Sequence, residues 1–333
     1  MRIPGAKTAR SFSRWVRARL LGGALILGYH RVAHIRDDAY EVCVSPANFA
    51  EHLENLRKYA NPIKLSKLVE YLQAGSLPPH SVAVTFDDGY VDNLYEARPL
   101  LEKYAVPATV FVCTGYAGRE FWWDELERLV MASQADPQAL RLQVGESRFN
   151  WNPPGGDREA AGLSVRRQFR HALYNFLLLL NVEDLNQAMS TIRSWAGLQP
   201  GDPAGSRAMT HQELVQLADG DLIELGSHTR HHPMLSILSP EGQREEIISG
   251  KQDLEAVLGR PVRGFAYPNG RAFDSAKHIV READFAYACT SLHDVVRPSS
   301  DLYELTRFWQ KDVDGDKFMQ GLKLWMGRSA AHA

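Results

Sequence analysis

Two adjacent carboxylates, Asp87 and Asp88, follow a run of apolar and β-prone residues at 82–86 and precede Gly89. The run is typical of a buried strand, whose carboxyl end would place both charges at one edge of a parallel sheet, where α/β folds build their sites. Neighbouring aspartates repel each other and lose solvation, so the pair indicates a nearby cation or a carboxylate that acts as a base. By itself, the pattern fits a solvated Asp-Asp-Gly turn equally well.

Two histidines, His228 and His232, occupy a similar position after a second predicted strand at 222–225. Gly226 and Pro233 place them in a loop, and side chains four residues apart on a helical turn can reach one ion. One carboxylate and two imidazoles form a standard hydrolytic metal set with open positions. The alternative is a pair of surface histidines near a helix start. Because two strand ends offer matching ligand types, we predict a metal site.

The elements that must position these residues alternate between strands and helices, which implies parallel βαβ units. About seven strand–helix units would make a barrel. Strands are expected at 24–29, 82–86, 108–112, 222–225, 264–267 and 287–290, and helices at 46–60, 66–75, 93–104, 210–220, 240–258, 274–283 and 317–326.

The alternation of strands and helices stops between residues 118 and 207, where helical patterns dominate and few strands are indicated. The helices expected in this region span 125–133, 163–180 and 182–195. We therefore predict a helical insertion at 118–207 within an α/β domain formed by 24–117 and 208–333, preceded by a basic N-terminal segment at 1–23.

Composition excludes several classes of protein. The chain has 333 residues, 44% of them hydrophobic, and a net charge of −2, which argues against a nucleic-acid partner. Its three cysteines are widely spaced and predict no disulfide framework, which favours a reducing compartment. No obligate protein partner is indicated.

The basic N-terminal segment resembles a signal peptide, but its apolar run is short and no cleavage site of small residues is visible. We favour a solvated charged segment over peripheral contact with an anionic membrane. A cytoplasmic location is expected, with the inner membrane face as an alternative and secretion less favoured.

Three short motifs resemble the polysaccharide deacetylase family, the NodB-homology group also called carbohydrate esterase family 4. They are Thr85–Tyr90, His228–His232 and Phe265–Gly270, and Tyr29–Val32 is similar to the opening segment of one branch of that family. The resemblance covers residues 24–116 and 209–310. It implies a distorted (β/α)7 barrel and a divalent metal, most often Zn²⁺.

The resemblance also implies a role for each motif residue. Asp88, His228 and His232 would bind the metal, and Asp87 would be the general base. A bound metal lowers the pKa of its water and polarises an amide carbonyl, while an adjacent unliganded carboxylate can take the water's proton. We expect the backbone N–H of Asn269 to help hold the oxyanion.

The chain departs from the family pattern where many members carry an arginine that orients the base, since Ala266 stands there. Arg263 or Arg307 could reach the same space. We favour Arg307, a lone cation among apolar residues after the last strand, and its alternative is a surface salt bridge. The family's late histidine, its general acid, also has no clean match. Two candidates could replace it, His293 and the favoured His30, which could instead bind substrate or be structural.

Substrate-contacting residues are less clearly indicated. Trp122 and Trp123 could stack on a sugar ring, although anchoring the insertion is an equally good interpretation. Tyr90, Tyr267 and Pro268 are expected to form part of the cleft wall.

The sequence therefore predicts a metal-dependent N-deacetylase of an amino sugar in a polysaccharide, oligosaccharide or glycolipid. One alternative is a deformylase or other deacylase of a lipid-linked amino sugar. Another is a non-catalytic glycan-binding or assembly protein.

Overall fold

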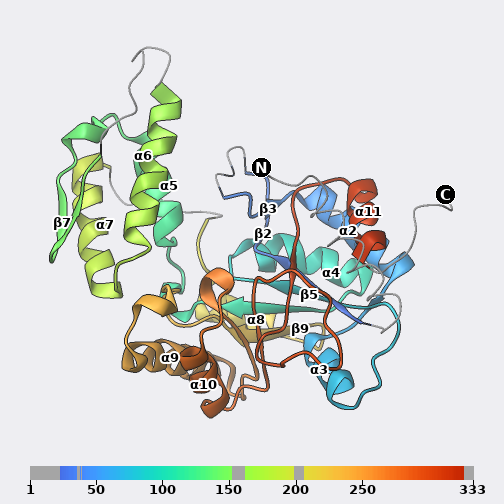
Figure 1. Cartoon of the computed structure of the whole chain (residues 1–333). Coiled ribbons are helices and arrows are strands. Elements are labelled where there is room, and N and C mark those ends of the chain that lie inside the picture. The colour runs from blue at the N-terminus through green and yellow to red at the C-terminus, as the bar shows by residue number, and fades with distance from the viewer. Residues whose placement is uncertain (1–22, 36–37, 39, 152–161, 199–205, 326–333) are drawn as a thin grey trace, which may run out of the picture.

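A parallel β-sheet forms the centre of the chain. The structure, a computed structural model, describes residues 23–35, 38, 40–151, 162–198 and 206–325 (Figure 1), so all but the last residue of the predicted segment 1–23 lies outside it. All neighbouring strands of the sheet run parallel. Their order is β11 (Tyr287–Cys289), β10 (Gly264–Ala266), β9 (Ile223–Ser227), β6 (Ala108–Val112), β5 (Ser81–Phe86), β1 (Leu25–Tyr29) and β12 (Phe308–Trp309), with β4 (Asn61–Pro62) paired beside β5.

The segment 302–309 joins the two ends of this sheet. Leu302 O accepts from Ala288 N at 2.8 Å and Leu305 N donates to Ala288 O at 2.9 Å, beside β11. Three residues later, Phe308 is in register with Leu27 of β1. The sheet therefore curls round on itself, and with its outer helices it forms the distorted (β/α)7 barrel, which confirms the predicted fold class.

The barrel helices follow the strands and cover the outside of the sheet (Figure 1). They are α2 (Pro46–Tyr59), α3 (Leu65–Gln73), the π-helical turn η1 (Asn93–Ala97) with α4 (Arg98–Tyr104), α8 (His211–Leu217), α9 (Pro240–Leu258), α10 (Asp274–Glu282) and α11 (Gly315–Trp325). The capping box at Thr210 and Glu213 and the Ser239 cap of α9 form as their sequences indicate. Ser66 does not begin α3 but lies inside it.

The helices of the region predicted as an insertion form a separate lobe, which we call the helical lobe (Figure 1). It contains α5 (Trp122–Ala132), α6 (Gly162–Leu177), α7 (Val182–Ala196) and an antiparallel hairpin of β7 (Leu142–Val144) and β8 (Ser147–Phe149). The lobe has its own hydrophobic cluster. The sequence pattern did not indicate the hairpin, whose strands have three residues each. The loop expected at 152–156 lies outside the described residues.

Side chains of β10 and of the residue after it point alternately into the barrel interior and towards the outer helices. Ala266 faces the interior cluster that contains Phe111 and Cys289, whereas Tyr267 packs with Phe265 in the cluster that the helices cover. Successive strand residues point to opposite faces, so Tyr267 cannot share the orientation of Ala266. The expectation that Tyr267 lines the cleft is therefore wrong, because its side chain is fully buried and donates to Tyr303 O.

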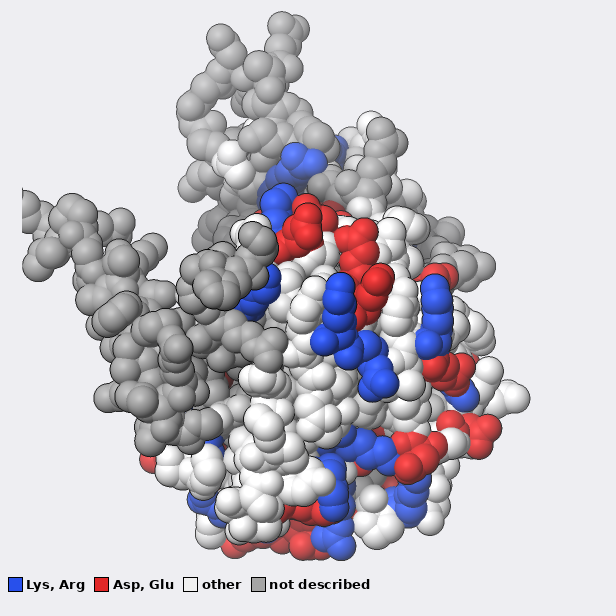
Figure 2. Space-filling model, turned by 90° about the vertical axis from the view of Figure 1, so that its right-hand side faces the viewer, with Lys and Arg blue, Asp and Glu red and all other residues white. Residues whose placement is uncertain are grey.

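The surface of the described part of the chain shows two general features. None of its helices is both long and apolar enough to span a bilayer. On the face drawn in Figure 2, acidic and basic side chains lie close to one another, without an extended surface of one sign.

Candidate metal centre

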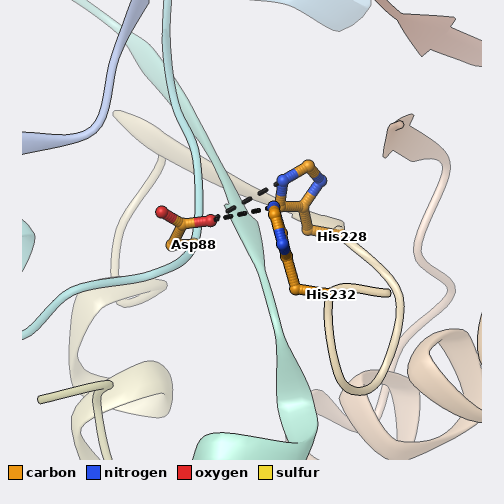
Figure 3. Close-up of side chains that lie close together, drawn as sticks. All are labelled: Asp88, His228 and His232. Atoms are coloured by element: carbon orange, nitrogen blue, oxygen red, sulfur yellow. Dashed lines mark ion pairs between the residues drawn. The ribbon is translucent and has the colours of Figure 1, made fainter. Parts of the chain in front are cut away.

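Asp88, His228 and His232 converge at the carboxyl ends of β5 and β9 (Figure 3). Strand β6 lies between these strands and fixes both backbones, because Cys113 N donates to Asp88 O at 3.1 Å and His228 N donates to Val112 O at 2.9 Å. The Nε2 atoms of the two histidines each lie 3.7 Å from Asp88 Oδ1. All three candidate ligand atoms lie within 4.8 Å of one another, close enough for one ion to bridge them.

The two histidines are brought together by a tight loop and not by the helical turn that their spacing suggested. Thr229 and His232 have positive φ angles of 65° and 56°, and Thr229 Oγ1 accepts from His232 N at 3.1 Å. Asp88 also has a positive φ, of 72°. Left-handed backbone is costly for residues other than glycine and tends to persist where function requires it.

The tautomer of His228 is set by a hydrogen bond to the backbone. Its Nδ1 lies 2.7 Å from Ala266 O, and because a carbonyl oxygen only accepts, Nδ1 must carry the proton. The lone pair is then on Nε2, which faces Asp88. Metal-ligating histidines are commonly oriented in this way by a second hydrogen bond.

The electrostatics of the three side chains fit a divalent cation. Asp88 Oδ1 is buried and has no hydrogen-bond partner, which is costly for a carboxylate oxygen. Burial, and then the charge of Asp87, raise the pKa of Asp88 well above its usual value. Burial lowers the pKa of both His228 and His232, which keeps them neutral. Neutral imidazoles beside an uncompensated carboxylate are the donors that a zinc-type ion binds.

Asp87 is held by Arg307, from the segment that closes the barrel. Its two carboxylate oxygens accept from Nη1 and Nη2 of Arg307 at 2.6 and 2.8 Å, and the arginine is completely buried. Arg307 also donates to Thr290 O at 3.0 Å. Burial would raise the pKa of Asp87, but the Arg307 guanidinium outweighs it, so that this pKa falls to about 2. Asp87 is therefore ionised at neutral pH.

Arg307, and not a residue of the third motif, therefore pairs with Asp87. Ala266 leaves the motif position small, and the Arg307 guanidinium lies over the rings of Phe111 and Trp309 inside the barrel. Arg263, the other candidate, cannot take this place because it pairs with Asp284 on the surface, with exposed side-chain fractions of 54% and 80%.

His30 and His293, the two candidate acids, lie in different surroundings. His30 stacks on Trp309, with ring centroids 4.4 Å apart. His30 follows β1, whose last residue is in register with Phe86 of β5, so it lies at the same sheet edge as Asp87. Burial lowers the pKa of His30 to about 4. His293 is exposed after β11, with its ring beside Phe308. The geometry therefore favours His30 over His293.

Two of the aromatic residues expected to contact substrate belong instead to the packing of the helical lobe. Trp122 is 6% exposed and stacks on Tyr174 of α6, so it packs within the lobe and offers no open face to a sugar. Tyr90 is 1% exposed and connects two residues of α5, since it accepts from Trp123 Nε1 at 2.7 Å and donates to Asp124 at 2.8 Å. Neither side chain forms an open cleft wall.

Trp123 remains close to the candidate metal ligands. Its ring centroid lies 4.9 Å from that of His232, and its other neighbours include the stacked ring of Phe121. At 8% exposure it offers little area for sugar stacking. Trp123 is therefore better placed to pack against His232 than to stack on a sugar ring.

The turn Pro268–Gly270 follows β10, with Pro268 buried and Asn269 exposed. Asn269 has a φ of 57°, and a side chain at Gly270 would overlap Ser291. The turn therefore presents Asn269 and not Pro268 to solvent, so Pro268 supports the turn instead of lining the cleft.

Sequence reasoning missed Glu246 of α9, which holds the loop between the two histidines. Its carboxylate accepts from His231 N at 2.8 Å and pairs with His231 Nδ1 at 2.7 Å, while its carbonyl accepts from Arg230 N at 3.2 Å. A glutamate in the middle of a predicted surface helix has no distinguishing signal. Trp309, which stacks on His30, was also missed.

Gly250 of α9 makes the close approach of this loop possible. A Cβ there would lie 2.5–2.9 Å from the backbone of Thr229 and Arg230. We expect Gly250→Ala to cost about 1–3 kcal/mol of stability by overpacking and to weaken metal binding about 10- to 100-fold by shifting the loop. Urea denaturation and competition with a zinc chelator would measure the two effects.

Gly242→Ala is the matched control on the same helix, because its Cβ would meet only ordinary contacts at 3.4 Å or more. It should leave metal affinity unchanged. Unchanged metal affinity in Gly250→Ala as well would show that the loop does not position the histidines.

Comparison with known proteins identifies the family. The polysaccharide deacetylase family model matches residues 74–135 and 175–288, just over half of the chain, and the chain belongs to that family. The matched residues include Asp87, Asp88, His228 and His232 but neither His30 nor Arg307.

A poly-β-1,6-N-acetyl-D-glucosamine N-deacetylase of Staphylococcus aureus is 33% identical over 111 residues, covering 29% of this chain and 38% of that protein. The chain thus spans well under half the length of this relative. The fold is shared with the deacetylase PplD of Streptococcus pyogenes, solved with acetate (TM-score 0.59, 18% identity, 91% of this chain and 99% of that one). It is also shared with IcaB of Ammonifex degensii (TM-score 0.58, 21% identity, 91% and 97%).

Proposed function

We propose that this chain is a metal-dependent N-deacetylase of an N-acetylated amino sugar within a glycan or glycolipid. One observation supports this most strongly. A buried carboxylate oxygen of Asp88 without a hydrogen-bond partner faces two imidazole nitrogens, next to a second carboxylate, Asp87, that Arg307 keeps ionised. Hydrolysis of an amide needs these two parts, an electrophilic centre and a separate base.

Asp88, His228 and His232 would hold the metal, and their mixed oxygen and nitrogen donors suit Zn²⁺. When bound, such an ion lowers the pKa of water and polarises a carbonyl. The remaining steps fall to residues of the chain. Asp87 would take the proton of the attacking water, and the backbone N–H of Asn269 would donate to the oxygen of the tetrahedral intermediate.

His30 would face the leaving nitrogen or a hydroxyl group of the sugar. Because burial lowers its pKa to about 4, the imidazole is neutral near pH 7 and has one N–H to donate. This favours hydrogen bonding to substrate over the role of a proton donor at neutral pH.

The substrate class follows from chemistry and from similarity. The staphylococcal relative is named for a β-1,6-linked N-acetylglucosamine polymer, so N-acetylglucosamine in a glycan is the substrate that we propose. Removal of a formyl group would use the same residues. The Arg307–Asp87 pair favours an active hydrolase over a non-catalytic binding protein, since a glycan-binding protein has no need of an ionised buried base.

Location is a further part of the proposal. The segment 1–23 contains six Lys and Arg side chains and no Asp or Glu, a composition that anionic membrane surfaces attract. We propose a cytoplasmic protein that can contact the inner membrane face. Fractionation of cells at low and high salt would test this, and a protein found only outside the cell would contradict it.

Acetate release and metal content test the proposed activity together. The purified protein should contain about one zinc per chain and release acetate from N-acetylglucosamine oligosaccharides. His228→Ala should lose both, because it removes a candidate ligand whose imidazole is anchored to β10. Stoichiometric zinc without release of acetate or formate from a broad glycan panel would contradict the assignment. His278→Ala, an exposed histidine paired with Glu282, is the control and should change neither property.

A further inference from the structure

Helix α5 of the helical lobe places a carboxylate, that of Asp124, beside the metal centre. Its Oδ2 accepts from the hydroxyl of Tyr90 at 2.8 Å, and Tyr90 is two residues after Asp88. The adjacent Trp123 donates to the same hydroxyl at 2.7 Å and packs its ring 4.9 Å from that of His232. Asp124 is thus connected to two of the three candidate ligands by short paths.

The second oxygen of Asp124 is available to a ligand. The described residues provide no hydrogen bond to Oδ1, and the side chain is partly exposed, unlike its neighbours Trp123 and Tyr90. Burial raises the pKa of Asp124 to about 7, and its charge in turn raises that of Asp88. Asp124 is therefore largely surrounded by protein yet keeps accessible surface, next to Tyr90 and Trp123, which pack beside the candidate ligands.

Arg31, whose charge acts on this carboxylate, is already paired with another acid. Arg31 lies over the Tyr90 ring at 4.3 Å, and its Nε donates to Asp92 at 2.8 Å. Among the described residues, Asp124 forms no ion pair of its own. A partly buried carboxylate with only one donor has unused acceptor capacity, which a ligand rich in hydroxyl groups can fill.

We propose that Asp124 binds the substrate by accepting a hydrogen bond from a hydroxyl of the amino sugar whose acyl group is removed. Tyr90 would hold the carboxylate through Oδ2, which leaves Oδ1 for the sugar hydroxyl, and the adjacent Trp123 packs against His232. The helical lobe would therefore add a specificity residue to those of the barrel. This inference rests on the proposed function, and it names the hydroxyl groups of the sugar, not the acyl group, as what the lobe recognises.

Binding can be measured without turnover in the Asp87→Asn background. The probe is a β-1,6-linked N-acetylglucosamine tetramer, titrated calorimetrically into the zinc-loaded protein. At a pH above 7, where Asp124 is ionised, adding Asp124→Ala should raise Kd about 10- to 100-fold, because a hydrogen bond to a charged group is lost. Asp124→Asn keeps an acceptor oxygen and should stay within a few-fold. Zinc content and Tm should change little in either variant.

Two further variants separate binding from structure. Tyr90→Phe releases the carboxylate from its tether and should weaken binding several-fold. Glu127→Gln removes a charge one turn further along the same helix, where Glu127 pairs with Arg170, and should leave Kd unchanged.

Several outcomes would overturn the inference. These are an unchanged Kd in Asp124→Ala, a loss of zinc in parallel with binding, or the absence of tetramer binding in the Asp87→Asn background. With Asp87 intact, an Asp124→Ala variant that loses turnover but still binds the tetramer would indicate that Asp124 transfers a proton. That result would also overturn the inference. If Asp124→Ala does not fold, an unchanged Kd in Tyr90→Phe decides against the inference. Acetate release by the unmodified protein is measured separately, so Asp124-dependent binding without acetate release contradicts only the proposed function.

Discussion

Asp87→Asn is expected to lower kcat/KM for acetate release by roughly 10²–10⁴-fold while zinc stays bound. Asparagine keeps the shape of the side chain and can still accept a hydrogen bond from Arg307, but it cannot take a proton from water. The metal should be unaffected because the candidate ligand is Asp88, whose Oδ1 faces both histidines. Steady-state kinetics and metal analysis on the same preparation would measure the two properties.

Asp88→Asn is the matched control for this prediction. It makes the same chemical change one residue later and should release the metal, with activity lost as a consequence. If Asp87→Asn loses zinc and Asp88→Asn retains it, the two carboxylates have been assigned in the wrong order.

Arg307→Met is expected to destabilise the fold by about 3–5 kcal/mol, because it leaves the buried Asp87 carboxylate without its partner. Activity should fall as well, since burial alone raises the pKa of Asp87 and a protonated carboxyl cannot act as a base. The acid limb of the kcat/KM profile should therefore move to higher pH. Urea denaturation and a pH–rate profile would measure these effects.

The pH dependence of stability has a defined sign. In the unmodified protein the pKa of Asp87 falls to about 2, below its unfolded value of about 4, so the pair stabilises the fold above about pH 4. That contribution is lost as the pH falls from about 4 towards 2. The stability difference between the unmodified protein and Arg307→Met should therefore be largest near neutral pH and shrink in this acidic range.

Arg263→Met is the control for the loss of an arginine. Arg263 pairs with Asp284 on the surface, where such pairs contribute less than about 1 kcal/mol. A loss of stability in Arg307→Met no larger than that in Arg263→Met would show that the buried pair does not hold Asp87.

The candidate ligands could be predicted because each follows a recognisable strand. The apolar run before Asp87 and Asp88 forms β5, and His228 follows β9 directly. Parallel strands end at the same edge of a sheet, so residues about 140 positions apart are brought together by topology alone. The strand at 108–112 and the helix at 240–258 also form at the residues predicted.

The environment of Asp87 was less accessible to sequence reasoning. Arg307 lies in a segment whose strand, β12, is only two residues long and has no periodic pattern. Its direction depends on how 302–309 closes the barrel, which is a property of the whole sheet. The lone cation among apolar residues was the available signal, and it indicated burial without indicating a partner.

Aromatic residues near the site were the hardest to interpret. Tyr267 and Tyr90 belong to the motifs themselves, yet both are buried, because alternation along the strand and the docking of α5 decide where their rings point. Asp124 has no sequence signal at all, since an acidic residue in the first turn of a helix is common. Sequence therefore located the ligands better than the walls around them.

Anomalous diffraction at the zinc edge, from crystals of the zinc-loaded protein, tests most directly whether Asp88 is the ligand and Asp87 the base. The structure predicts one strong peak bonded to an oxygen of Asp88 and to Nε2 of both His228 and His232, with Asp87 still paired to Arg307. A peak bonded to Asp87, or no zinc between these three side chains in protein that releases acetate, would contradict it.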